Sequence, residues 1–388
     1  MNKDLNSTAK ANVNGTSSIA VCQLTTRHAV TDNRILNLMA ETLSDAGYIS
    51  SVAGPHNCNT ELNGVQVVAC PSTSSLKGKL LRVTAPCRLL CYALADRDCS
   101  VYAIHDPDMI KIGVLLKLMG KHIVYDIHDD YEATVKTIMY KFGKPLAYIA
   151  SKLWWFYEKS LTKYFDGVTV ADRHLEQKFK WKSPVVLSNS PPLNFTGVAD
   201  TSHENTFNMI FVGGVTNYRG VPKIVEALRL LPQPDIRFIV IGNCCDKSIL
   251  DLMRSDDRVD YLGRVPWLEL HKYYEKSHLG VAPYQPIPSF LYCTGENAVK
   301  IQEYMAAGIA VITSNFPGLN KFVADTEIGL TVKPDDPEDI AEKIEQLYYD
   351  RVLLKKLGAN GRKAFEECYN WDLHKHKLIQ LYDRITGR

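Results

Sequence analysis

No apolar run in the sequence reaches transmembrane length, roughly 18 or more residues, and neither sign of charge dominates. The 45 basic and 43 acidic side chains leave a formal net charge of +2 at pH 7, which gives no general attraction to nucleic acid or to a membrane. The ten cysteines include no C-x-x-C pair and follow no regular spacing, which argues against a structural zinc site and a disulfide framework. We therefore expect reduced thiols, a cytoplasmic location and no nucleic-acid partner.

Short apolar runs of strand length alternate with amphipathic helical patterns along the chain. Continuous apolar runs are typical of parallel strands that helices cover on both faces. Two such series predict an α/β protein with two Rossmann-like domains. The predicted strands are Ile19–Cys22, Val65–Cys70, Val101–His105, Ile123–His128, Gly167–Ala171 and Val185–Ser188, then Met209–Gly213, Ile236–Gly242, Val259–Leu262, Leu279–Tyr284 and Ala310–Ser314.

Composition also divides the chain into segments. The mostly polar residues 1–17 lack an apolar signal core and predict a disordered N-terminus. A stretch rich in Ser, Thr and Asn predicts a linker over 191–206, between an N-terminal domain over 18–190 and a C-terminal domain over 207–368. The remaining residues, 369–388, predict a final amphipathic helix.

The segment Gly295–Gly308 predicts a loop followed by a helix of about three turns, and a buried strand comes next. Lys300 and Glu303 are three apart and share a face of that helix. Its N-terminus near Glu296 offers free N–H groups and a partial positive charge. This combination suits a ligand with phosphates and hydroxyls. A surface helix with an ordinary Lys–Glu pair explains the same spacing.

A second loop, Phe211-Val-Gly-Gly-Val-Thr-Asn-Tyr-Arg-Gly-Val221, follows a predicted strand and opens a helix. Gly213 and Gly214 let the backbone approach a ligand closely. Arg219 adds a permanent planar cation that can grip a diphosphate. A plain turn or a dinucleotide site is the alternative, although the G-x-G-x-x-G spacing of the latter is absent.

Both segments resemble the group 1 glycosyltransferases, which are retaining enzymes with the GT-B fold. K-I-Q-E-Y-M-A-A-G-I-A-V-I is similar to their K-x-x-E-Y-M-A-x-G-x-P-V-I, with Ala310 in place of proline. F-V-G-G-x4-R-G is similar to their F-V-G-R-x4-K-G, with Arg219 at the lysine position and Gly214 in place of arginine. Other members carry two glutamates eight residues apart, and here Gly295 stands at the first position with Glu296 beside it.

The resemblance implies two Rossmann-like domains facing across a cleft, with the closing N-W helix crossing back to the N-terminal domain. It implies transfer of a sugar, with retention, from a nucleoside diphosphate sugar to a sugar or lipid-linked acceptor in bacterial surface polysaccharide or glycolipid assembly. Arg219 and Lys300 would stabilise the leaving diphosphate, and Glu303 would bind the ribose. A nucleotide-sugar epimerase and a non-catalytic nucleotide-sugar binder are the alternatives. The other residues expected to contact the donor are Gly213, Gly214, Thr294, Gly295, Glu296 and Asn297.

In the first half, Val124–Tyr131 resembles the family's Y-D-x-H-E, which implies that His128 contacts the donor sugar. The segment ends a predicted strand and so faces the interdomain crevice. A capping or structural histidine is the alternative. Thr31–Ile35 resembles the D-x-R opening of the first long helix in related enzymes, which places Asp32 and Arg34 on the acceptor side. An N-cap and a surface arginine explain these two residues as well.

Two D-x-D triplets, Asp106–Asp108 and Asp96–Asp98, look like the metal motif of another glycosyltransferase fold. Asp106 stands where a helix cap is expected, and Pro107 falls at the first helical position. A hard divalent ion needs more converging oxygens than two residues give. We therefore expect no cofactor and no metal requirement.

The segment Lys136–Lys163 carries six lysines against one acidic residue, Glu158, and many aromatic residues lie between them. This composition is typical of an interfacial helix and predicts contact with the inner face of the membrane. The alternative is that Trp154 and its neighbours pack into the N-terminal domain.

Overall fold

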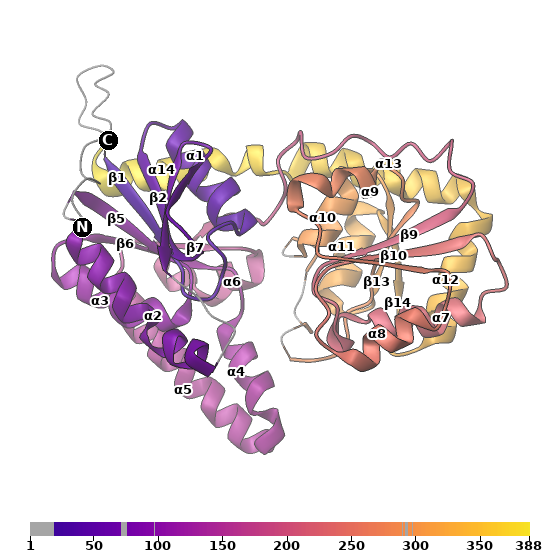
Figure 1. The fold of residues 1–388 in the computed structure, drawn as a ribbon, viewed down its shortest axis with the longest axis horizontal. Helices are drawn as coiled ribbons and strands as arrows, with labels where there is room; N and C mark the ends of the chain where they lie inside the picture. The colour runs from indigo at the N-terminus through magenta and orange to yellow at the C-terminus, as the bar shows by residue number, and fades with distance from the viewer. Residues whose placement is uncertain (1–18, 71–75, 97, 289, 292–293, 297) are drawn as a thin grey trace.

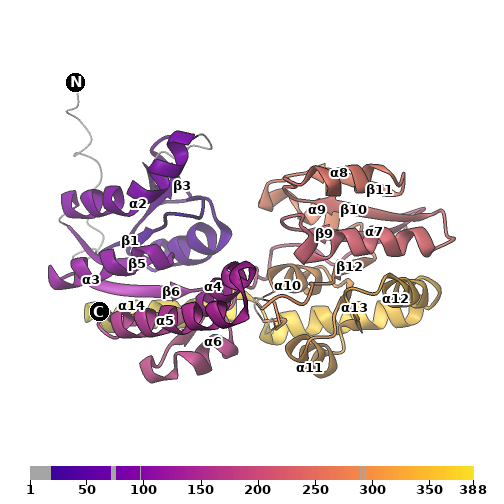
Figure 2. The same ribbon diagram turned by 90° about the horizontal axis from the view of Figure 1, so that it is seen from below.

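Two α/β domains, each built on one mainly parallel sheet, make up the computed structural model, and helices lie on both sides of each sheet (Figures 1 and 2). The structure describes residues 19–70, 76–96, 98–288, 290–291, 294–296 and 298–388, so the predicted disordered segment 1–17 lies outside them. The first sheet has the order β3-β4-β2-β1-β5-β6-β7-β8, and only β3 runs antiparallel to its neighbour. The second sheet, β11-β10-β9-β12-β13-β14, is parallel throughout.

All eleven predicted strands are present, each within two residues of its predicted ends. The first sheet consists of β1 (Ala20–Leu24), β2 (Ile49–Pro55), β3 (Thr60–Leu62), β4 (Val65–Cys70), β5 (Cys99–Ile104), β6 (His122–Ile127), β7 (Gly167–Val170) and β8 (Val185–Val186). The second consists of β9 (Phe207–Val212), β10 (Ile236–Ile241), β11 (Val259–Gly263), β12 (Leu279–Ala282), β13 (Ala310–Ser314) and β14 (Gly329–Val332).

Three strands, β2, β3 and β14, were not predicted. In β2 the polar residues Ser50 and Ser51 are buried, and they interrupt the apolar run that marks a strand buried on both faces. Ser51 Oγ donates to Val21 O at 3.3 Å, so its burial leaves no unpaired hydroxyl. The other two strands have three and four residues, too few to show a period.

Helices connect the strands in both domains. In the N-terminal domain they are η1 (Asn33–Ala40), α1 (Glu41–Asp45), α2 (Leu76–Ala95), η2 (Pro107–Met109), α3 (Ile110–Leu118), α4 (Tyr131–Met139), η3 (Tyr140–Phe142), α5 (Lys144–Thr162), α6 (Arg173–Lys178) and η4 (Lys180–Lys182). In the rest of the chain they are η5 (Asn217–Arg219), α7 (Val221–Leu230), α8 (Lys247–Arg254), η6 (Trp267–Glu269), α9 (His271–Tyr274), α10 (Val299–Ala306), α11 (Pro317–Thr326), α12 (Pro337–Tyr349), α13 (Arg351–Cys368), η7 (Trp371–Leu373) and α14 (Lys375–Thr386). None of the helices in these ranges combines the length and apolar character needed to cross a membrane.

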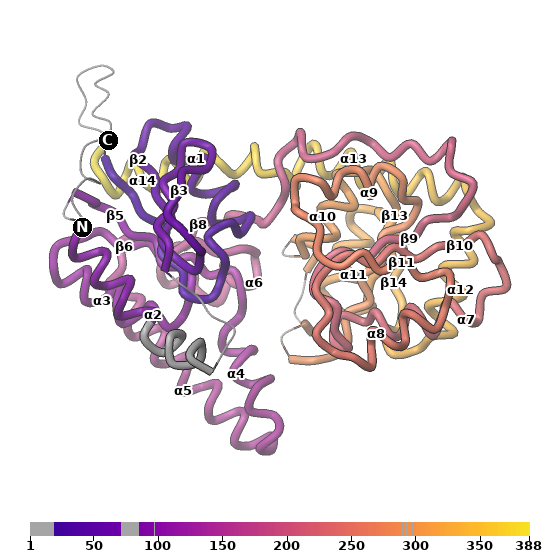
Figure 3. The backbone as a smooth tube through the Cα atoms, in the orientation of Figure 1, coloured from indigo at the N-terminus to yellow at the C-terminus, as the bar shows by residue number. Residues whose placement is uncertain are grey.

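The chain passes between the domains twice, after β8 and between α13 and α14 (Figure 3). The two crossings touch, because Trp371 N donates to Pro191 O at 3.0 Å. The Trp371 indole then enters the core of the N-terminal domain and donates to Thr42 Oγ1 at 2.9 Å, and Tyr382 of α14 is fully buried there. The predicted return of the last helix to the first domain is therefore confirmed.

The basic segment forms a helical hairpin, α4–η3–α5, that projects from the N-terminal domain (Figure 1). Trp154 and Trp155 are half-buried and pack against the domain core, so the packing alternative is correct for these two residues. Glu158 is also buried, only 1% exposed, and accepts a hydrogen bond from Tyr125 OH at 2.8 Å. The exposed surface of Lys136–Lys163 therefore carries lysines without an acidic residue of the same segment.

Burial raises the pKa of Glu158 to about 7, against the lowering effect of the Tyr125 hydrogen bond. The folded chain therefore holds this proton more tightly than the unfolded chain, in which the ordinary value is 4.5. The stabilisation is present in full below the unfolded value and is lost as pH rises through the folded one. We predict that Glu158→Gln and the wild type have the same unfolding free energy at pH 5. At pH 8 the unfolding free energy of the variant should be larger by about 2–3 kcal/mol. Urea denaturation at both pH values tests this, and equal differences at both would contradict it.

Candidate active site at the domain boundary

The glycine loop after β9 brings two cationic side chains next to the backbone. Gly213 has a φ of +132°, and a Cβ there would lie 3.0 Å from Arg219 Nη1 and 3.4 Å from Lys300 Nζ. At Gly220 a Cβ would lie 2.0 Å from Pro283 O, so α7 can start this close to the end of β12 only with glycine. The structure thus brings Gly213, Arg219 and Lys300 together. Gly214 is exposed with open space around it, so no side chain at this position supplies the arginine of the family pattern.

Lys300 is the second residue of α10 and is only 5% exposed. Its Nζ donates to Tyr284 OH at 3.2 Å and lies 5.0 Å from the ring centre of Phe211 and 4.9 Å from that of Tyr284. Aromatic faces stabilise the ammonium where water is largely excluded. The alternative of a surface helix with an ordinary Lys–Glu pair is therefore wrong.

The helix itself begins later than predicted. α10 starts at Val299, so Glu296 lies in a turn and not at the helix N-terminus. Gln302 explains the delay, because its Nε2 donates to Gly295 O at 3.0 Å and to Glu296 O at 2.9 Å and holds these carbonyls in the turn. Ser188 Oγ, from the N-terminal domain, donates to Glu296 O at 2.8 Å. Gln302 occupies an unspecified position of K-x-x-E, and no pattern in the sequence indicated its role.

Glu303 is 3% exposed, and its two carboxylate oxygens accept from Trp267 Nε1 at 2.9 Å and from Tyr274 OH at 2.7 Å. Burial raises the pKa of Glu303, against these hydrogen bonds and the charge of Lys300. Each carboxylate oxygen has two acceptor sites, so a ribose would share the group with Trp267 and Tyr274.

The loop before α10 lies at the boundary of the domains. Gly295 is packed against Phe322, whose ring a Cβ would meet at 2.0 Å, so no side chain fits at the position of the family's first glutamate. Glu296 Oε1 lies 3.2 Å from Arg173 Nε of the N-terminal domain. Burial raises the pKa of Glu296, against the charge of Arg173. Thr294 is half-buried in the same loop, and Asn297 lies outside the described residues.

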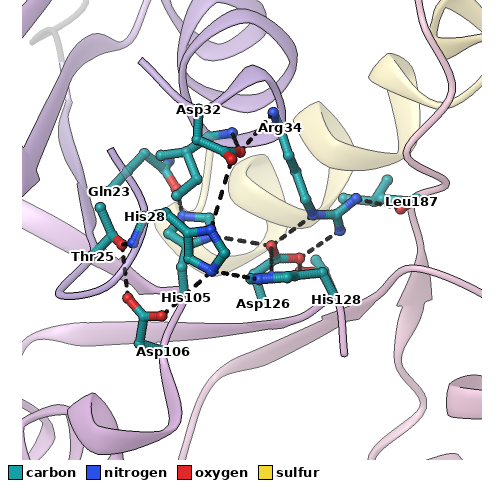
Figure 4. Close-up of polar contacts among 12 residues, drawn as sticks. Gln23, Thr25, His28, Asp32, Arg34, His105, Asp106, Asp126, His128 and Leu187 are labelled. Atoms are coloured by element: carbon teal, nitrogen blue, oxygen red, sulfur yellow. Dashed lines mark hydrogen bonds and ion pairs between the residues drawn. The ribbon is translucent and has the colours of Figure 1, made fainter. Parts of the chain in front are cut away.

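His128 follows β6 and belongs to a polar cluster in the N-terminal domain (Figure 4). Its Nε2 lies 3.0 Å from His28 Nε2, and its Nδ1 lies 3.5 Å from Asp126 Oδ2. Burial alone would lower the pKa of His28, but the hydrogen bond to Asp32 and the charge of Asp106 raise it. The structure therefore places His128 at the carboxyl end of the sheet beside a second histidine.

Arg34 is 6% exposed and makes a two-pronged contact with Asp126, Nε to Oδ2 at 2.8 Å and Nη2 to Oδ1 at 2.6 Å (Figure 4). Its Nη1 also donates to Leu187 O at 2.8 Å. The surface-arginine alternative is thus wrong, because Arg34 joins the first helix to β6 and to the chain leaving β8. Burial would raise the pKa of Asp126, but Arg34 holds it well below its ordinary value. Asp32 caps the helix as predicted and accepts from Arg34 N and Ile35 N.

Asp106 occupies the N-cap position of η2 as predicted, but its side chain makes no capping hydrogen bond. Its Oδ2 accepts from Thr25 Oγ1 and Thr26 N, both at 2.7 Å, so it holds the loop after β1. The side chain bonds to this loop and not to the helix backbone, and Pro107 opens η2 as predicted. Asp108 Oδ1 accepts from Thr26 Oγ1 at 2.8 Å. Both carboxylates of this D-x-D triplet are therefore engaged within the fold.

Among the described residues, His105, Asp126 and His128 have ligand atoms close enough together to hold a metal ion. However, Arg34 contacts both oxygens of Asp126, and Thr169 Oγ1 donates to one of them at 2.6 Å. A metal ion there would have to displace a buried guanidinium, at a large electrostatic cost. Metal independence stays a prediction that activity measurements can test.

Two doubly wound domains with a glycine loop and a buried lysine at their boundary define a GT-B protein. The family model for group 1 glycosyl transferases matches residues 199–364. This match lies in the C-terminal domain and includes both motifs that resemble the group 1 glycosyltransferases.

Similar proteins share these features at low identity. The capsular polysaccharide biosynthesis glycosyltransferase CapM of Staphylococcus aureus is 27% identical over 46% of each chain, so this chain spans about half the length of that relative and of others like it. The phosphatidyl-myo-inositol mannosyltransferase of Mycolicibacterium smegmatis is 23% identical over 90% of this chain and 89% of its own. The Anabaena protein HepE, solved with UDP and glucose, shares the fold with a TM-score of 0.70 at 12% identity, covering 94% of this chain and all of HepE.

Proposed function

We propose that this chain transfers a sugar from a nucleoside diphosphate sugar to a hydroxyl acceptor, with retention of configuration. The meeting of Gly213, Arg219 and Lys300 carries the proposal. A leaving diphosphate gains negative charge as the glycosidic bond breaks, and two fixed cations beside an open backbone stabilise that charge without reorganisation. HepE was solved with UDP, which makes UDP-sugars the first donors to test.

The remaining residues would act around this centre. Glu303 would accept from ribose hydroxyls, and His128 would contact the sugar from the opposite domain, so transfer would require the domains to close. The two domains already contact each other here, because Glu296 of the C-terminal domain contacts both Arg173 and Ser188 of the N-terminal domain.

Incubation with labelled UDP-, GDP- and ADP-sugars, with and without a bacterial membrane extract, tests the proposal. A transferase releases nucleoside diphosphate and moves label to a product only when acceptor is present. Conversion of the donor without any acceptor would indicate an epimerase. Binding without turnover under either condition would indicate a non-catalytic binder.

Transfer should not require a divalent ion, because Arg219 and Lys300 supply fixed positive charge where a metal would otherwise act. We predict that excess EDTA leaves turnover within about twofold of the untreated rate, since the protein's own electrostatic stabilisation is retained. Initial rates with EDTA, and with added magnesium or manganese, measure the effect. Loss of transfer on chelation, followed by its recovery with either ion, would contradict the prediction.

We further propose a lipid-linked acceptor in surface polysaccharide or glycolipid assembly, which the names of CapM and the mannosyltransferase support. The α4–η3–α5 hairpin supplies the structural argument. Four apolar side chains at helical spacing form an exposed stripe on α5, which we call the α5 stripe: Leu146 (47% exposed), Ile149 (54%), Leu153 (65%) and Phe156 (71%). Apolar side chains flanked by lysines match the interface of an anionic bilayer.

We predict that the wild type sediments with vesicles of phosphatidylglycerol and phosphatidylcholine at low salt and detaches as salt is raised. The double variant Ile149→Ser, Phe156→Ser should bind at least about tenfold more weakly, because two large side chains no longer enter the bilayer. Val352→Ser is the matched control, since Val352 is 83% exposed on α13 of the other domain. Equal sedimentation of the double variant, or no binding by the wild type, would contradict the membrane contact.

A further inference from the structure

A cavity of about 520 Å³ lies between the start of α3 and the α4–η3–α5 hairpin, apart from the glycine loop and the lysine of the C-terminal domain. The loop after β1 contributes Arg27, and α3 contributes Lys111. Val135 of α4 and Ala150 and Leu153 of α5 form an apolar wall. The cavity therefore combines cations at one side with an aliphatic surface at the other.

Trp154 also lines this cavity, and its Nε1 is buried without a hydrogen-bond partner among the described residues. The indole nitrogen is a donor only, so it needs an acceptor from elsewhere. A buried donor left unpaired destabilises a protein, and most buried donors are paired. The nitrogen is closed off from solvent, so a ligand oxygen pairs it when the indole or its neighbours shift on binding.

The cations of the cavity are only partly balanced. Arg27 Nε lies 3.6 Å from Asp108 Oδ1, and that oxygen also accepts from Thr26. Lys111 Nζ lies 5.9 Å from the ring centre of Tyr157. Two cations against one carboxylate leave a positive lining, which favours an anionic group.

The apolar wall continues onto the outer surface of the protein. Leu153 lines the cavity and also belongs to the α5 stripe, where it is 65% exposed. A ligand could therefore place an anionic head in the cavity and lay an apolar chain along the stripe. A free inorganic anion would use only the first of these features.

We propose that this cavity binds the phosphate-bearing head of an amphiphilic acceptor, an inference that rests on the proposed transfer to a lipid-linked acceptor. Arg27 and Lys111 contact the phosphate, Trp154 Nε1 donates to one of its oxygens, and the apolar chain leaves past Leu153. The next residue after Arg27 is His28, whose Nε2 lies 3.0 Å from His128 Nε2. The head therefore lies one residue along the chain from the histidine pair of the candidate active site.

Calorimetric titration with dodecyl phosphate, below its micelle concentration, tests the cavity without knowledge of the natural acceptor. The proposal predicts that dodecyl phosphate binds at least about tenfold more tightly than inorganic phosphate, which lacks the chain, and than dodecyl maltoside, which lacks the charge. If inorganic phosphate bound equally well, the apolar chain would not contribute and the ligand would not be an amphiphile. If dodecyl maltoside bound equally well, the cavity would not select an anionic head group.

Variants locate the binding. Arg27→Met and Lys111→Met should each raise the Kd for dodecyl phosphate about tenfold, and Trp154→Phe, which keeps an aromatic ring and removes the N–H, about fivefold. Lys180→Met, an exposed lysine on η4 outside the cavity, should leave it unchanged. Unchanged Kd values in all three cavity variants would overturn the proposal. UDP titration of the same proteins tests the donor site separately from the cavity. A wild type that binds dodecyl phosphate but no nucleotide would contradict the donor site and leave the cavity proposal standing.

Discussion

Replacing Lys300 with methionine should lower turnover by about 10²–10³-fold, as for the loss of one preorganised donor to a developing negative charge. Arg219→Met should have an effect of the same order, because the two side chains meet at Gly213. Methionine is preferable to alanine at position 300. Lys300 is buried with its Nζ beside the rings of Phe211 and Tyr284, and a cavity left by alanine would confuse loss of charge with loss of packing. The measurement is kcat at saturating donor, from release of nucleoside diphosphate.

Lys321→Met serves as the control, since Lys321 pairs with Asp325 on the exposed surface of α11, where its side chain is 77% exposed. Its kcat should match the wild type. Thermal unfolding of the Lys300 and Arg219 variants should stay close to wild type, which would assign the loss to chemistry. Near-normal kcat in both site variants would remove these residues from the reaction.

Arg34→Met should be the most destabilising of the changes considered, at about 3–5 kcal/mol, because it leaves the buried carboxylate of Asp126 without its partner. Arg237→Met provides an unusually close control. Arg237 contacts Asp260 through the same two atoms, Nε at 3.1 Å and Nη2 at 2.6 Å, but the side chains are 32% and 41% exposed. An exposed pair of this kind contributes about 0–1 kcal/mol. Urea denaturation followed by tryptophan fluorescence compares the two variants, and equal losses would refute the role given to burial.

The pH dependence of the same variants adds a second readout. The folded-state pKa of Asp126 lies well below its ordinary value, so its contribution is present above the unfolded pKa and is lost only in acid. Without Arg34 the main cause of that lowering is gone, and burial then favours the protonated acid. The unfolding free energy of Arg34→Met should therefore fall as pH rises from 5 to 8 relative to that of the wild type. A constant difference between the two proteins would contradict this.

Much of the fold could be predicted because the strands of parallel sheets are continuous apolar runs, a local property of the sequence. The strand β2 was not predicted, because the reason for its burial lies in neighbouring strands and not in its own sequence. Ser51 is buried because the neighbouring strand satisfies its hydroxyl through Val21 O, and Ser50 is buried beside it. The late start of α10 has the same kind of cause, since Gln302 holds the carbonyls of the preceding turn.

In the candidate site, too, the sequence predicted some features and not others. Gly213 and Arg219 lie within one short motif, and Lys300 lies in another whose pattern resembles a known family, so sequence could propose all three. The partners of these motifs come from distant parts of the chain. Arg34 and Asp126 are 92 residues apart, and Trp267 lies 36 residues from the Glu303 carboxylate that it contacts. Hydrogen bonds of this range depend on the packed fold, and no spacing in the sequence encodes them.

A nucleoside diphosphate should bind at Arg219 and Lys300, and calorimetric titration with UDP, GDP and ADP measures this binding. The wild type should bind one of the three with one nucleotide per chain. The double variant Arg219→Met, Lys300→Met should bind that nucleotide at least about 100-fold more weakly, because two charge-assisted contacts to the diphosphate are lost. Arg237→Met should bind it as the wild type does. Equal affinity of the double variant and the wild type would contradict the account.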